Sequence, residues 1–422
     1  MKRVVITGFG AVTPLGNTFQ ASWEAVKSGK SGISPVTKFD VSEIPWKVAG
    51  EVKGFDAETC LESKEVRRLD PFIHYAVAAA GEALKDAGLF CGPEKNGGAL
   101  PSALEYRAAG GVIIGSSRGG IGSLERAITA RRSGKNLLLR PSAYLMPATT
   151  IGMASSYVAQ KFGIRGYCLG ISNACASGTN AVGEAYRLIR SGFKGPVIAG
   201  GSEAPLCRLC LEGYGASRVL SKTPDFSASR PFARTRDGFV LSEGACVMVL
   251  EDLDSAIGRG ARLYGEITGY SSTADAFHQT RPDRRGEVMA MRSAMADAGI
   301  SPCDVDYLNA HGTSTVIGDR VEAEAVSEVF SEKATSVPVS ATKSMTGHML
   351  AASGALEAAF TAMTIKEGII PPTVNLREKG TDCAINVITR KTGAKINTAI
   401  SNSFGFGGVN AVLVFKRINH PV

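Results

Sequence analysis

The sequence predicts an α/β fold in which strands and amphipathic helices alternate along the whole chain. Short apolar runs, bounded by glycine and polar residues, recur between helical segments, as in layered α/β proteins. An internal repeat is the second observation. Ala176-Ser177-Gly178 opens a predicted helix that ends near Gly192, and Ala352-Ser353-Gly354, 176 positions later, opens one that ends near Gly368. We therefore expect two related halves, residues 1–254 and 255–422.

Hydrophobic periodicity places the individual elements. The predicted strands are Val4–Gly8, Gly111–Ile114, Pro196–Gly200, Ala245–Leu250, Arg262–Gly269, Val305–Ala310, Val337–Ser340 and Ala411–Phe415. The predicted helices are Asp70–Ala87, Thr179–Arg190, Glu287–Ala298, Arg320–Phe330 and Gly354–Glu367. Residues 90–109 are predicted to form an irregular surface loop.

Composition indicates a globular protein with a large core. The chain has 422 residues, 44% of them hydrophobic, and no segment approaches the ~20 uninterrupted apolar residues of a membrane span. The basic start is followed by an apolar run that Gly8 and Gly10 break, so a first strand is favoured over a signal peptide. We expect a cytoplasmic protein, or the mature form of an organellar one.

Cysteine count and net charge narrow the function classes. Nine scattered cysteines do not form a secreted disulfide framework, and the lone pair Cys207 and Cys210 is interpreted as two ordinary thiols, so no metal site is predicted. The net charge of +8 fits either nucleic acid or an acidic protein partner. Because the chain lacks a nucleic-acid recognition motif, the protein partner is as good an interpretation.

Cys175 is the first candidate for chemistry. It lies in Ile-Ser-Asn-Ala-Cys-Ala-Ser-Gly, where an apolar run turns abruptly into a predicted helix. Unpaired N–H groups at a helix start favour a thiolate, so a lowered pKa is expected for this thiol. The alternative is a buried structural cysteine, which is the commoner role of a free thiol.

Two histidines and a glycine-rich loop add context. His311 in Asn-Ala-His-Gly-Thr-Ser-Thr and His348 in Lys-Ser-Met-Thr-Gly-His each follow a predicted strand, and the chain has only five histidines. Near the C-terminus, Asn-Ser-Phe-Gly-Phe-Gly-Gly combines two large side chains, Phe404 and Phe406, with glycines that can expose backbone N–H groups. Such a loop could donate an oxyanion-hole N–H and act as a gate.

These four motifs, in this order, resemble the β-ketoacyl-[acyl-carrier-protein] synthases of the elongating type II class. The similarity covers essentially the whole chain, from Val4 to Phe415. It implies a thiolase-like fold with two duplicated halves, each with a five-stranded mixed sheet, in α-β-α-β-α layers. It also implies an acyltransferase that condenses an acyl-enzyme thioester with malonyl carrier protein, with loss of CO2, in fatty acid elongation.

The resemblance assigns roles to residues. Cys175 would hold the acyl group, His311 and His348 would assist decarboxylation as neutral imidazoles, and Lys343 would order His348 and nearby charge. The N–H groups of Cys175 and Phe406 would form the oxyanion hole, and the Phe406 side chain would act as a gate beside Phe404. Thr313 and Thr315 would contact the phosphopantetheine arm, and Glu357 would pair with Lys343. No cofactor is expected, because the substrates travel on the phosphopantetheine arm of the carrier protein.

The resemblance also suggests partners. Lys64, Arg67 and Arg68 match a basic helix start that docks the acidic acyl carrier protein, Arg218 would extend this patch, and Lys135 and Arg140 match more loosely. The alternative is a solvated charged face. A homodimer is expected, and a heterodimer is possible.

Arg118 departs from the family pattern, because its position usually carries a small or apolar residue that lines the acyl pocket. Either the guanidinium points away, or it shortens and polarises the pocket, which predicts short or functionalised acyl chains. A polyketide or other secondary-metabolite ketosynthase therefore stays open. A chain-length-factor partner would usually lack Cys175, and a thiolase needs a second cysteine where Phe404-Gly405-Phe406 stands.

Overall fold

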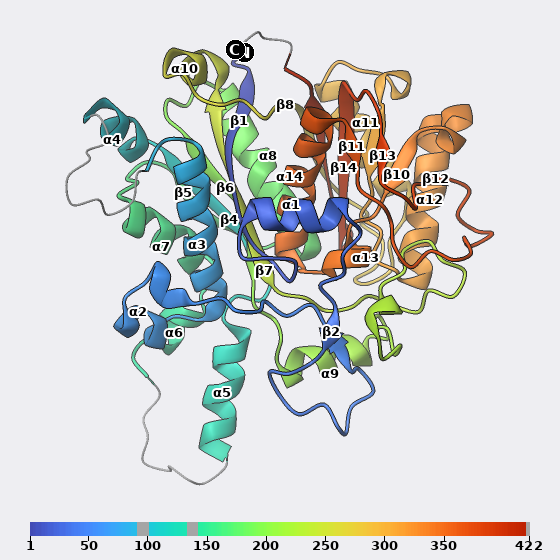
Figure 1. The fold of residues 1–422 in the computed structure, drawn as a ribbon, viewed down its shortest axis with the longest axis horizontal. Coiled ribbons are helices and arrows are strands. Elements are labelled where there is room, and N and C mark those ends of the chain that lie inside the picture. The colour runs from blue at the N-terminus through green and yellow to red at the C-terminus, as the bar shows by residue number, and fades with distance from the viewer. Residues whose placement is uncertain (91–100, 133–141, 419–422) are drawn as a thin grey trace.

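The computed structural model describes residues 1–90, 101–132 and 142–418 (Figure 1). The N-terminal elements are β1 (Val4–Val12), α1 (Phe19–Lys27), β2 (Ser34–Pro35), β3 (Val48–Ala49), α2 (Ser63–Arg68), α3 (Pro71–Asp86), α4 (Pro101–Ala108), β4 (Gly111–Gly115), α5 (Ile121–Arg132), α6 (Leu145–Thr149), α7 (Met153–Phe162), β5 (Cys168–Ile171), α8 (Ser177–Arg190), β6 (Val197–Glu203), α9 (Arg208–Ala216) and β7 (Gly244–Asp252). The C-terminal elements are α10 (Leu253–Gly258), β8 (Gly265–Ala274), α11 (Arg284–Asp297), β9 (Tyr307–Asn309), α12 (Val316–Phe330), β10 (Pro338–Ser340), α13 (Lys343–Thr346), α14 (Ala351–Glu367), β11 (Ile369–Ile370), β12 (Asn386–Val387), β13 (Thr392–Gly393), β14 (Thr398–Gly405) and β15 (Val409–Lys416).

The strands repeat one topology twice. In the described part of the chain they form a mixed sheet in the order β12-β10-β9-β14-β15-β8-β1-β7-β6-β4-β5. Within β1-β7-β6-β4-β5 the first two pairings are antiparallel and the last two parallel, and β8-β15-β14-β9-β10 pairs in the same way. The two five-stranded units join edge to edge, because β1 also pairs with β8 from Val4 to Ile6. This arrangement agrees with the predicted fold class.

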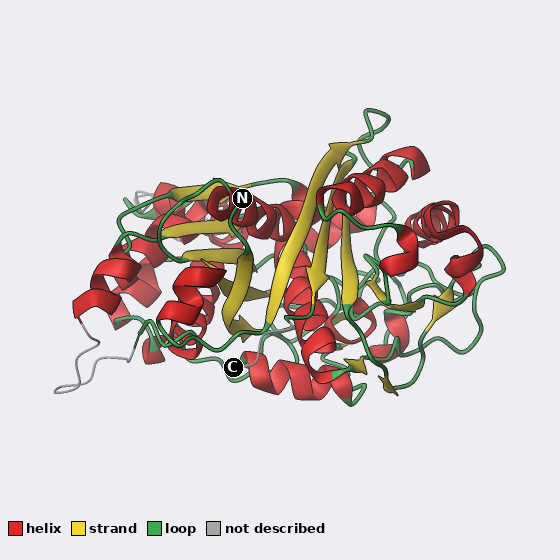
Figure 2. Cartoon of the chain, turned by 90° about the horizontal axis from the view of Figure 1, so that it is seen from above, coloured by secondary structure: helices red, strands yellow, loops and turns green. Residues whose placement is uncertain are grey.

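Helices cover both faces of each unit and fill the space between them. Helices α3 and α7 pack on the outer side of the N-terminal strands, and α11 and α12 pack on the outer side of the C-terminal strands (Figures 1 and 2). Helices α8 and α14 lie against each other between the units and form the central layer. Residues Ala351–Ile365 of α14 are all buried, because strands or helices surround this Ala-rich helix on every side.

Small residues allow α8 and α14 to approach closely. A Cβ atom on Gly178 would lie 2.3 Å from the carbonyl oxygen of Ala351, and one on Gly354 would lie 2.1 Å from Oγ1 of Thr179. Cys175 directly precedes α8, and His348 precedes α14. The contact between the two helices therefore brings their N-terminal ends, with Cys175 and His348, to one place.

All the predicted strands and helices are present, with ends that differ by a few residues. Strand β14 was not predicted, because its Ser and Asn side chains look like a loop, whereas its backbone is paired with β9 and β15 on both sides. The irregular loop predicted for residues 90–109 is wrong in its second part, where Pro101 begins helix α4 in the position that suits proline. Residues 91–100 lie outside the described part. No helix in the described residues is long and apolar enough to cross a membrane.

The α8–α14 contact predicts the effect of one added methyl group. Gly178→Ala should lower the free energy of unfolding by about 1–3 kcal/mol, because the new Cβ would clash with the backbone of Ala351 in the packed helix α14. The same substitution should slow acylation of Cys175. Gly213→Ala on α9 is the matched control, because its Cβ meets nothing within 4 Å; it should stabilise the protein by about 0.5–1 kcal/mol. Denaturant unfolding measures both variants, and an equal effect would contradict the tight contact.

Candidate active site

A strained turn presents the thiol of Cys175. After β5 the chain passes through Ala174 with φ +47°, a left-handed conformation that side chains rarely adopt, and a single 3-10 turn leads into α8. Ser177 fixes this turn, because its hydroxyl accepts from the N–H of Asn173 at 2.8 Å and donates to the carbonyl of Ala174 at 2.6 Å. Small side chains on both sides leave the sulfur accessible from the pocket.

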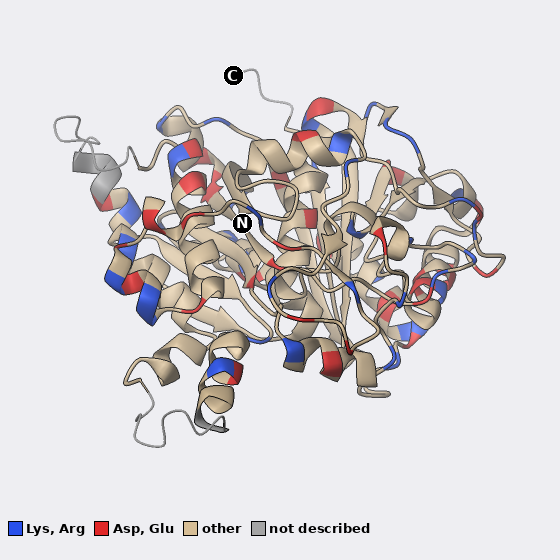
Figure 3. Ribbon diagram, turned by 60° about the horizontal axis from the view of Figure 1, so that its bottom comes forward, with Lys and Arg blue, Asp and Glu red and all other residues tan. Residues whose placement is uncertain are grey.

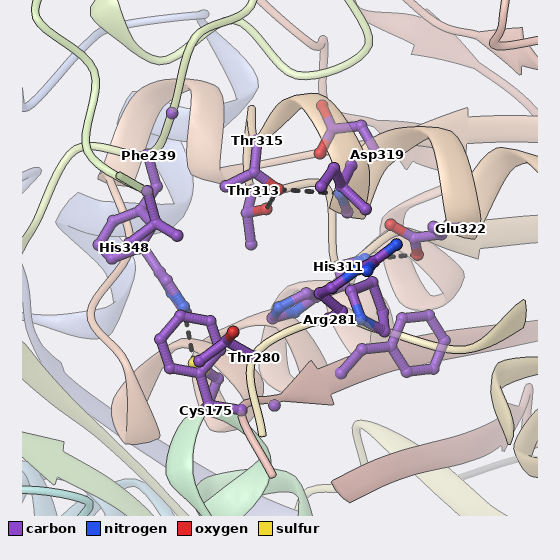
Figure 4. A pocket seen from close by; sticks show the side chains of 18 of the residues that line it. Cys175, Phe239, Thr280, Arg281, His311, Thr313, Thr315, Asp319, Glu322 and His348 are labelled. Atoms are coloured by element: carbon purple, nitrogen blue, oxygen red, sulfur yellow. Dashed lines mark hydrogen bonds between the residues drawn. The ribbon is translucent and has the colours of Figure 1, made fainter. Parts of the chain in front are cut away.

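His348 is held against the sulfur by a second turn. Gly347 and Leu350 have φ +67° and +48°, so the chain bends sharply on both sides of the histidine. The His348 N–H donates to the carbonyl of Val240 at 2.8 Å, and the Phe239 ring packs edge-on against the imidazole at 5.1 Å between centroids. Nε2 of His348 then lies 3.0 Å from Sγ of Cys175 (Figure 4).

His311 completes a compact group of three side chains. Its ring centroid lies 5.5 Å from that of His348, and the reactive atoms of Cys175, His311 and His348 all lie within 4.8 Å of one another. Glu322 fixes the His311 turn, because its carboxylate accepts from the N–H groups of His311 and Gly312, both at 2.8 Å. The structure therefore brings together three side chains that are far apart in the sequence.

Burial determines the protonation of this group. It lowers the pKa of His311 and His348 well below the ordinary value, and the charge of Lys343 lowers both further, so the imidazoles are neutral at neutral pH, as expected. The lowered pKa expected for Cys175 is wrong. Burial raises the pKa of this thiol to about 11, against the opposing effects of Lys343 and the Phe406 N–H, so the resting residue is a thiol next to a neutral His348.

Lys343 contacts His311, whereas the sequence predicted a contact with His348. Its ammonium group pairs with Glu357 at 2.5 Å, as expected, and donates to the carbonyl of His311 at 2.7 Å, with Nδ1 of His311 at 3.3 Å. A cation next to Nδ1 leaves the ring proton on Nε2 of His311. Nδ1 of His348 instead lies 3.1 Å from the hydroxyl of Ser353, a contact that sequence reasoning missed.

Two buried carboxyl groups of α12 were also missed. Besides Glu322, Asp319 accepts from the N–H groups of Phe232 and Ser314 at 2.7 and 3.0 Å, and burial raises its pKa to about 7. Both lie on the side of the helix that faces the core, where carboxyl groups are rare unless they bind a partner. That pattern, an acidic pair on the apolar face of a predicted helix, is the signal that could have found them.

A pocket of about 330 Å³ opens onto the three side chains. Thr313 and Thr315 line its wall, with their hydroxyl groups 3.0 Å apart (Figure 4). Phe404 packs against His311 at 6.0 Å, and Phe406 lies beside Tyr214 at 6.4 Å, both between ring centroids. The pocket wall therefore carries two hydroxyl groups at the threonines and aromatic rings next to His311 and Cys175.

The glycine loop after Phe406 is hydrogen-bonded to residues 275–279, a segment that the sequence analysis did not identify. Gly407 and Gly408 have φ +84° and +69°, and the Gly407 N–H donates to the carbonyl of Gln279 at 2.7 Å. The Asp275 N–H donates to the carbonyl of Gly408 at 2.8 Å. The next residues of that segment, Thr280 and Arg281, line the pocket (Figure 4), so residues 275–283 form part of its wall.

The predicted docking residues are divided between two places. Arg218 is exposed and lines the pocket, whereas α2, with Lys64, Arg67 and Arg68, contributes nothing to the pocket lining. Lys64 pairs with Glu62 at 2.7 Å, and the Arg68 guanidinium lies over the Tyr144 ring at 4.3 Å. Lys135 and Arg140 lie outside the described residues. Arg118 points to Tyr214, and its Nε donates to the Tyr214 hydroxyl at 2.9 Å.

Comparison with known proteins agrees with this site. Residues 1–256 match the family described as "Beta-ketoacyl synthase, N-terminal domain", and residues 264–377 match "Beta-ketoacyl synthase, C-terminal domain". The chain belongs to the β-ketoacyl synthase family. This confirms the resemblance on which the fold class was predicted.

Similar proteins cover the β-ketoacyl synthase chain almost end to end. A "3-oxoacyl-[acyl-carrier-protein] synthase 2" from Synechocystis is 42% identical and aligns over 99% of this chain and 98% of its own. The solved "ishigamide ketosynthase/chain length factor" superimposes with a TM-score of 0.91 at 32% identity, over 99% of this chain and 100% of its own. A type II polyketide ketosynthase solved with its acyl-carrier protein has a TM-score of 0.88 at 31% identity, with the same coverage.

The raised pKa of Cys175 predicts a steep pH dependence of alkylation. Because only the thiolate reacts, the rate constant for iodoacetamide should rise about tenfold per pH unit from pH 7 to about 10, and level off near the pKa of about 11. Peptide mass spectrometry measures the rate at Cys175, with the exposed Cys303 as an internal check on the reagent. A plateau below pH 8 would contradict a protonated resting thiol.

Proposed function

We propose that this chain is a β-ketoacyl-[acyl-carrier-protein] synthase that extends fatty acyl chains by decarboxylative condensation with malonyl carrier protein. One observation carries the proposal: the Cys175 sulfur, 3.0 Å from Nε2 of His348, shares the bottom of one pocket with a second neutral imidazole. The name of the 42% identical relative supports fatty acid elongation. The solved polyketide ketosynthases support polyketide synthesis more weakly, because they are only 31–32% identical.

The first half-reaction loads the acyl group. His348 Nε2 accepts the Cys175 proton, and the resulting thiolate attacks the carbonyl carbon of an acyl thioester. The tetrahedral oxygen accepts hydrogen bonds from the N–H groups of Cys175 and Phe406. The Phe406 N–H lowers the pKa of Cys175, against the effect of burial, and Gly405 lies close enough to Cys175 that an added Cβ would be 3.2 Å from its nitrogen. His348 returns the proton to the departing pantetheine sulfur, so the imidazole ends neutral.

The second half-reaction forms the carbon–carbon bond. A malonyl thioester takes the place of the first carrier arm, with Thr313 and Thr315 beside the arm and its carbonyl oxygen next to Nε2 of His311 and His348. Lys343 at Nδ1 of His311 leaves Nε2–H free to donate. His348 accepts at Nε2 in the first half-reaction and so carries its proton on Nδ1; to donate from Nε2 here it must change tautomer, and the Ser353 hydroxyl at Nδ1 can accept from the first tautomer and donate to the second. Loss of CO2 leaves an enolate that these donors stabilise. The enolate carbon attacks the acyl carbonyl, and Cys175 leaves as a thiolate that takes up one proton.

The rival activities fit the pocket less well. A thiolase would need a second thiol facing the first, and here Phe404, Gly405 and Phe406 occupy the wall beside Cys175. A non-catalytic chain-length partner would not need a thiol in hydrogen-bond contact with an imidazole. We also propose that no metal or cofactor takes part, since the three grouped side chains already account for proton transfer and for the stabilisation of both oxyanions.

Partners and location follow from charge and from exposed edges. The net charge of +8, with basic residues on α2 and Arg218 at the pocket, supports docking of an acidic carrier protein. Figure 3 shows how Lys and Arg are distributed over the ribbon, with Asp and Glu among them. Strand β5 is the edge of the sheet and alternates between exposed and half-buried residues, which supports pairing with a second copy in a homodimer. The resemblance to fatty acid synthases supports the cytoplasm as the location.

Single substitutions separate the two half-reactions. His311→Ala should leave acyl transfer to Cys175 within a few-fold of the parent and lower condensation by about 10²–10⁴-fold, since the donor to the enolate is lost. His348→Ala should lower condensation by a similar factor and slow acylation as well, because it also removes the proton acceptor. Mass spectrometry of the acyl-enzyme and a malonyl-carrier condensation assay measure the two steps. Full condensation without either histidine would contradict the proposed mechanism.

Charge reversal tests the docking surface. Arg67→Glu and Arg68→Glu, singly and together, should raise KM for carrier-bound substrates tenfold or more and leave acyl-pantetheine substrates nearly unchanged, because only the carrier protein is acidic. Arg292→Glu on α11, an exposed residue 3.8 Å from Glu328, is the control with the same charge change. Equal effects on both substrate types would exclude docking at α2.

A further inference from the structure

Two substrates must occupy the site at once, and this requires space on both sides of Cys175. The argument rests on the proposed condensation, in which the acyl chain stays on the sulfur while the malonyl arm enters. The open pocket with Thr313 and Thr315 takes the arm. On its other side Cys175 packs, together with Phe406, on an apolar cluster that includes Leu206, Leu211 and Tyr214. An acyl tail that passes Phe406 would meet this cluster.

Arg118 stands at the border of this cluster. The loop after β4 carries it, between the ends of β5 and β6, and its Nε donates to the Tyr214 hydroxyl at 2.9 Å. The guanidinium carbon lies 5.4 Å from the centre of the Tyr214 ring. Tyr214 in turn contacts Phe239 and Phe406 at 5.6 and 6.4 Å between ring centroids, and it lines the pocket of Cys175. One side chain thus connects the guanidinium to the wall of the reaction site.

Arg118 is exposed in the single chain and forms no ion pair with a carboxylate of the described residues, although the charge of Glu203 raises its pKa. The nearby carboxylate of Glu203 is occupied by neutral donors, namely the Ser116 and Ser117 hydroxyls and the N–H groups of Ser117, Arg118 and Ala351. No carboxylate of the described residues lies within 4.0 Å of the guanidinium, and the two terminal amino groups have no hydrogen-bond partner there. The Arg118 charge also favours the thiolate form of Cys175, lowering its pKa against burial, so it acts within electrostatic reach of the sulfur.

We propose that Arg118 is a specificity-determining residue that binds a carboxylate at the far end of the acyl chain, so that the enzyme elongates ω-carboxyacyl groups in preference to plain alkanoyl groups. A guanidinium offers two parallel donors that match a carboxylate. The Tyr214 hydroxyl, which accepts from Nε, keeps its own proton to donate to the same group. An alkyl tail in this position would desolvate the guanidinium without replacing the lost hydrogen bonds, so the arrangement also discriminates against the plain chain.

Competitive loading tests the proposal. Equimolar alkanoyl- and ω-carboxyalkanoyl-carrier thioesters, matched in chain length from four to ten carbons, compete for Cys175, and intact-protein mass spectrometry gives the ratio of the two acyl-enzymes. The parent protein should favour the carboxylated chain tenfold or more at one or more lengths. Arg118→Ile should reverse the ratio, and Tyr214→Phe should reduce it. Arg118→Lys should keep part of the preference, because lysine keeps the positive charge but lacks the two parallel donors of the guanidinium. Arg292→Ile, which removes an equal charge on α11, should leave the ratio unchanged.

Three outcomes would overturn the proposal. The first is a ratio that is the same in the parent protein and in Arg118→Ile. The second is a changed ratio that comes with a loss of dimer mass by light scattering in Arg118→Ile, which would mean that Arg118 pairs with a second copy of the chain and affects loading only through assembly. The third is the absence of either acyl group on Cys175 in every protein, which would overturn the proposed function as well; loading without carboxylate preference would leave that function standing.

Discussion

The close contact of α8 with α14 is the constraint on which the site depends. Each helix follows the same step of a repeated strand topology, and the two repeats are packed so that the helix starts converge. Gly178 and Gly354 leave no room for a side chain at this crossing. Because the nucleophile precedes one helix and a histidine precedes the other, the 3.0 Å contact between Cys175 and His348 is a consequence of how the two repeats pack.

Buried polar groups then fix the orientation of the site. Glu322 and Asp319 each accept two backbone N–H groups from turns that line the pocket, and Lys343 bridges Glu357 and His311. Such groups are costly to bury without partners, and the hydrogen bonds of Glu322 and Asp319 to backbone turns explain how an irregular loop region keeps a defined geometry. The same low-dielectric surroundings keep both imidazoles uncharged and the thiol protonated, so these three side chains carry no charge in the resting site.

Most of the fold and the reactive residues could be predicted from the sequence. The strand Val4–Val12 and the helix Ala351–Glu367 are recognisable as apolar runs, because both are buried on all sides, and the motifs around Cys175, His311 and His348 are local patterns. The predictions failed where long-range contacts decide. Strand β14 looks like a loop until its neighbours pair with it, and Lys343 was assigned to the histidine nearest in sequence, although it reaches the carbonyl of His311. The pKa of Cys175 was misjudged because helix-start effects are local, whereas burial depends on the whole molecule.

The sequence by itself determined the class of fold and the β-ketoacyl synthase family, and it singled out Cys175, His311 and His348 as candidates, because short runs of neighbouring residues carry these signals. Only the tertiary structure decided which groups touch: Ser353 with His348, Asp275 and Gln279 with the glycine loop after Phe406, and Arg118 with Tyr214. The physical reason is that charge, hydrogen bonding and burial act through distances in space, which separations along the chain do not specify.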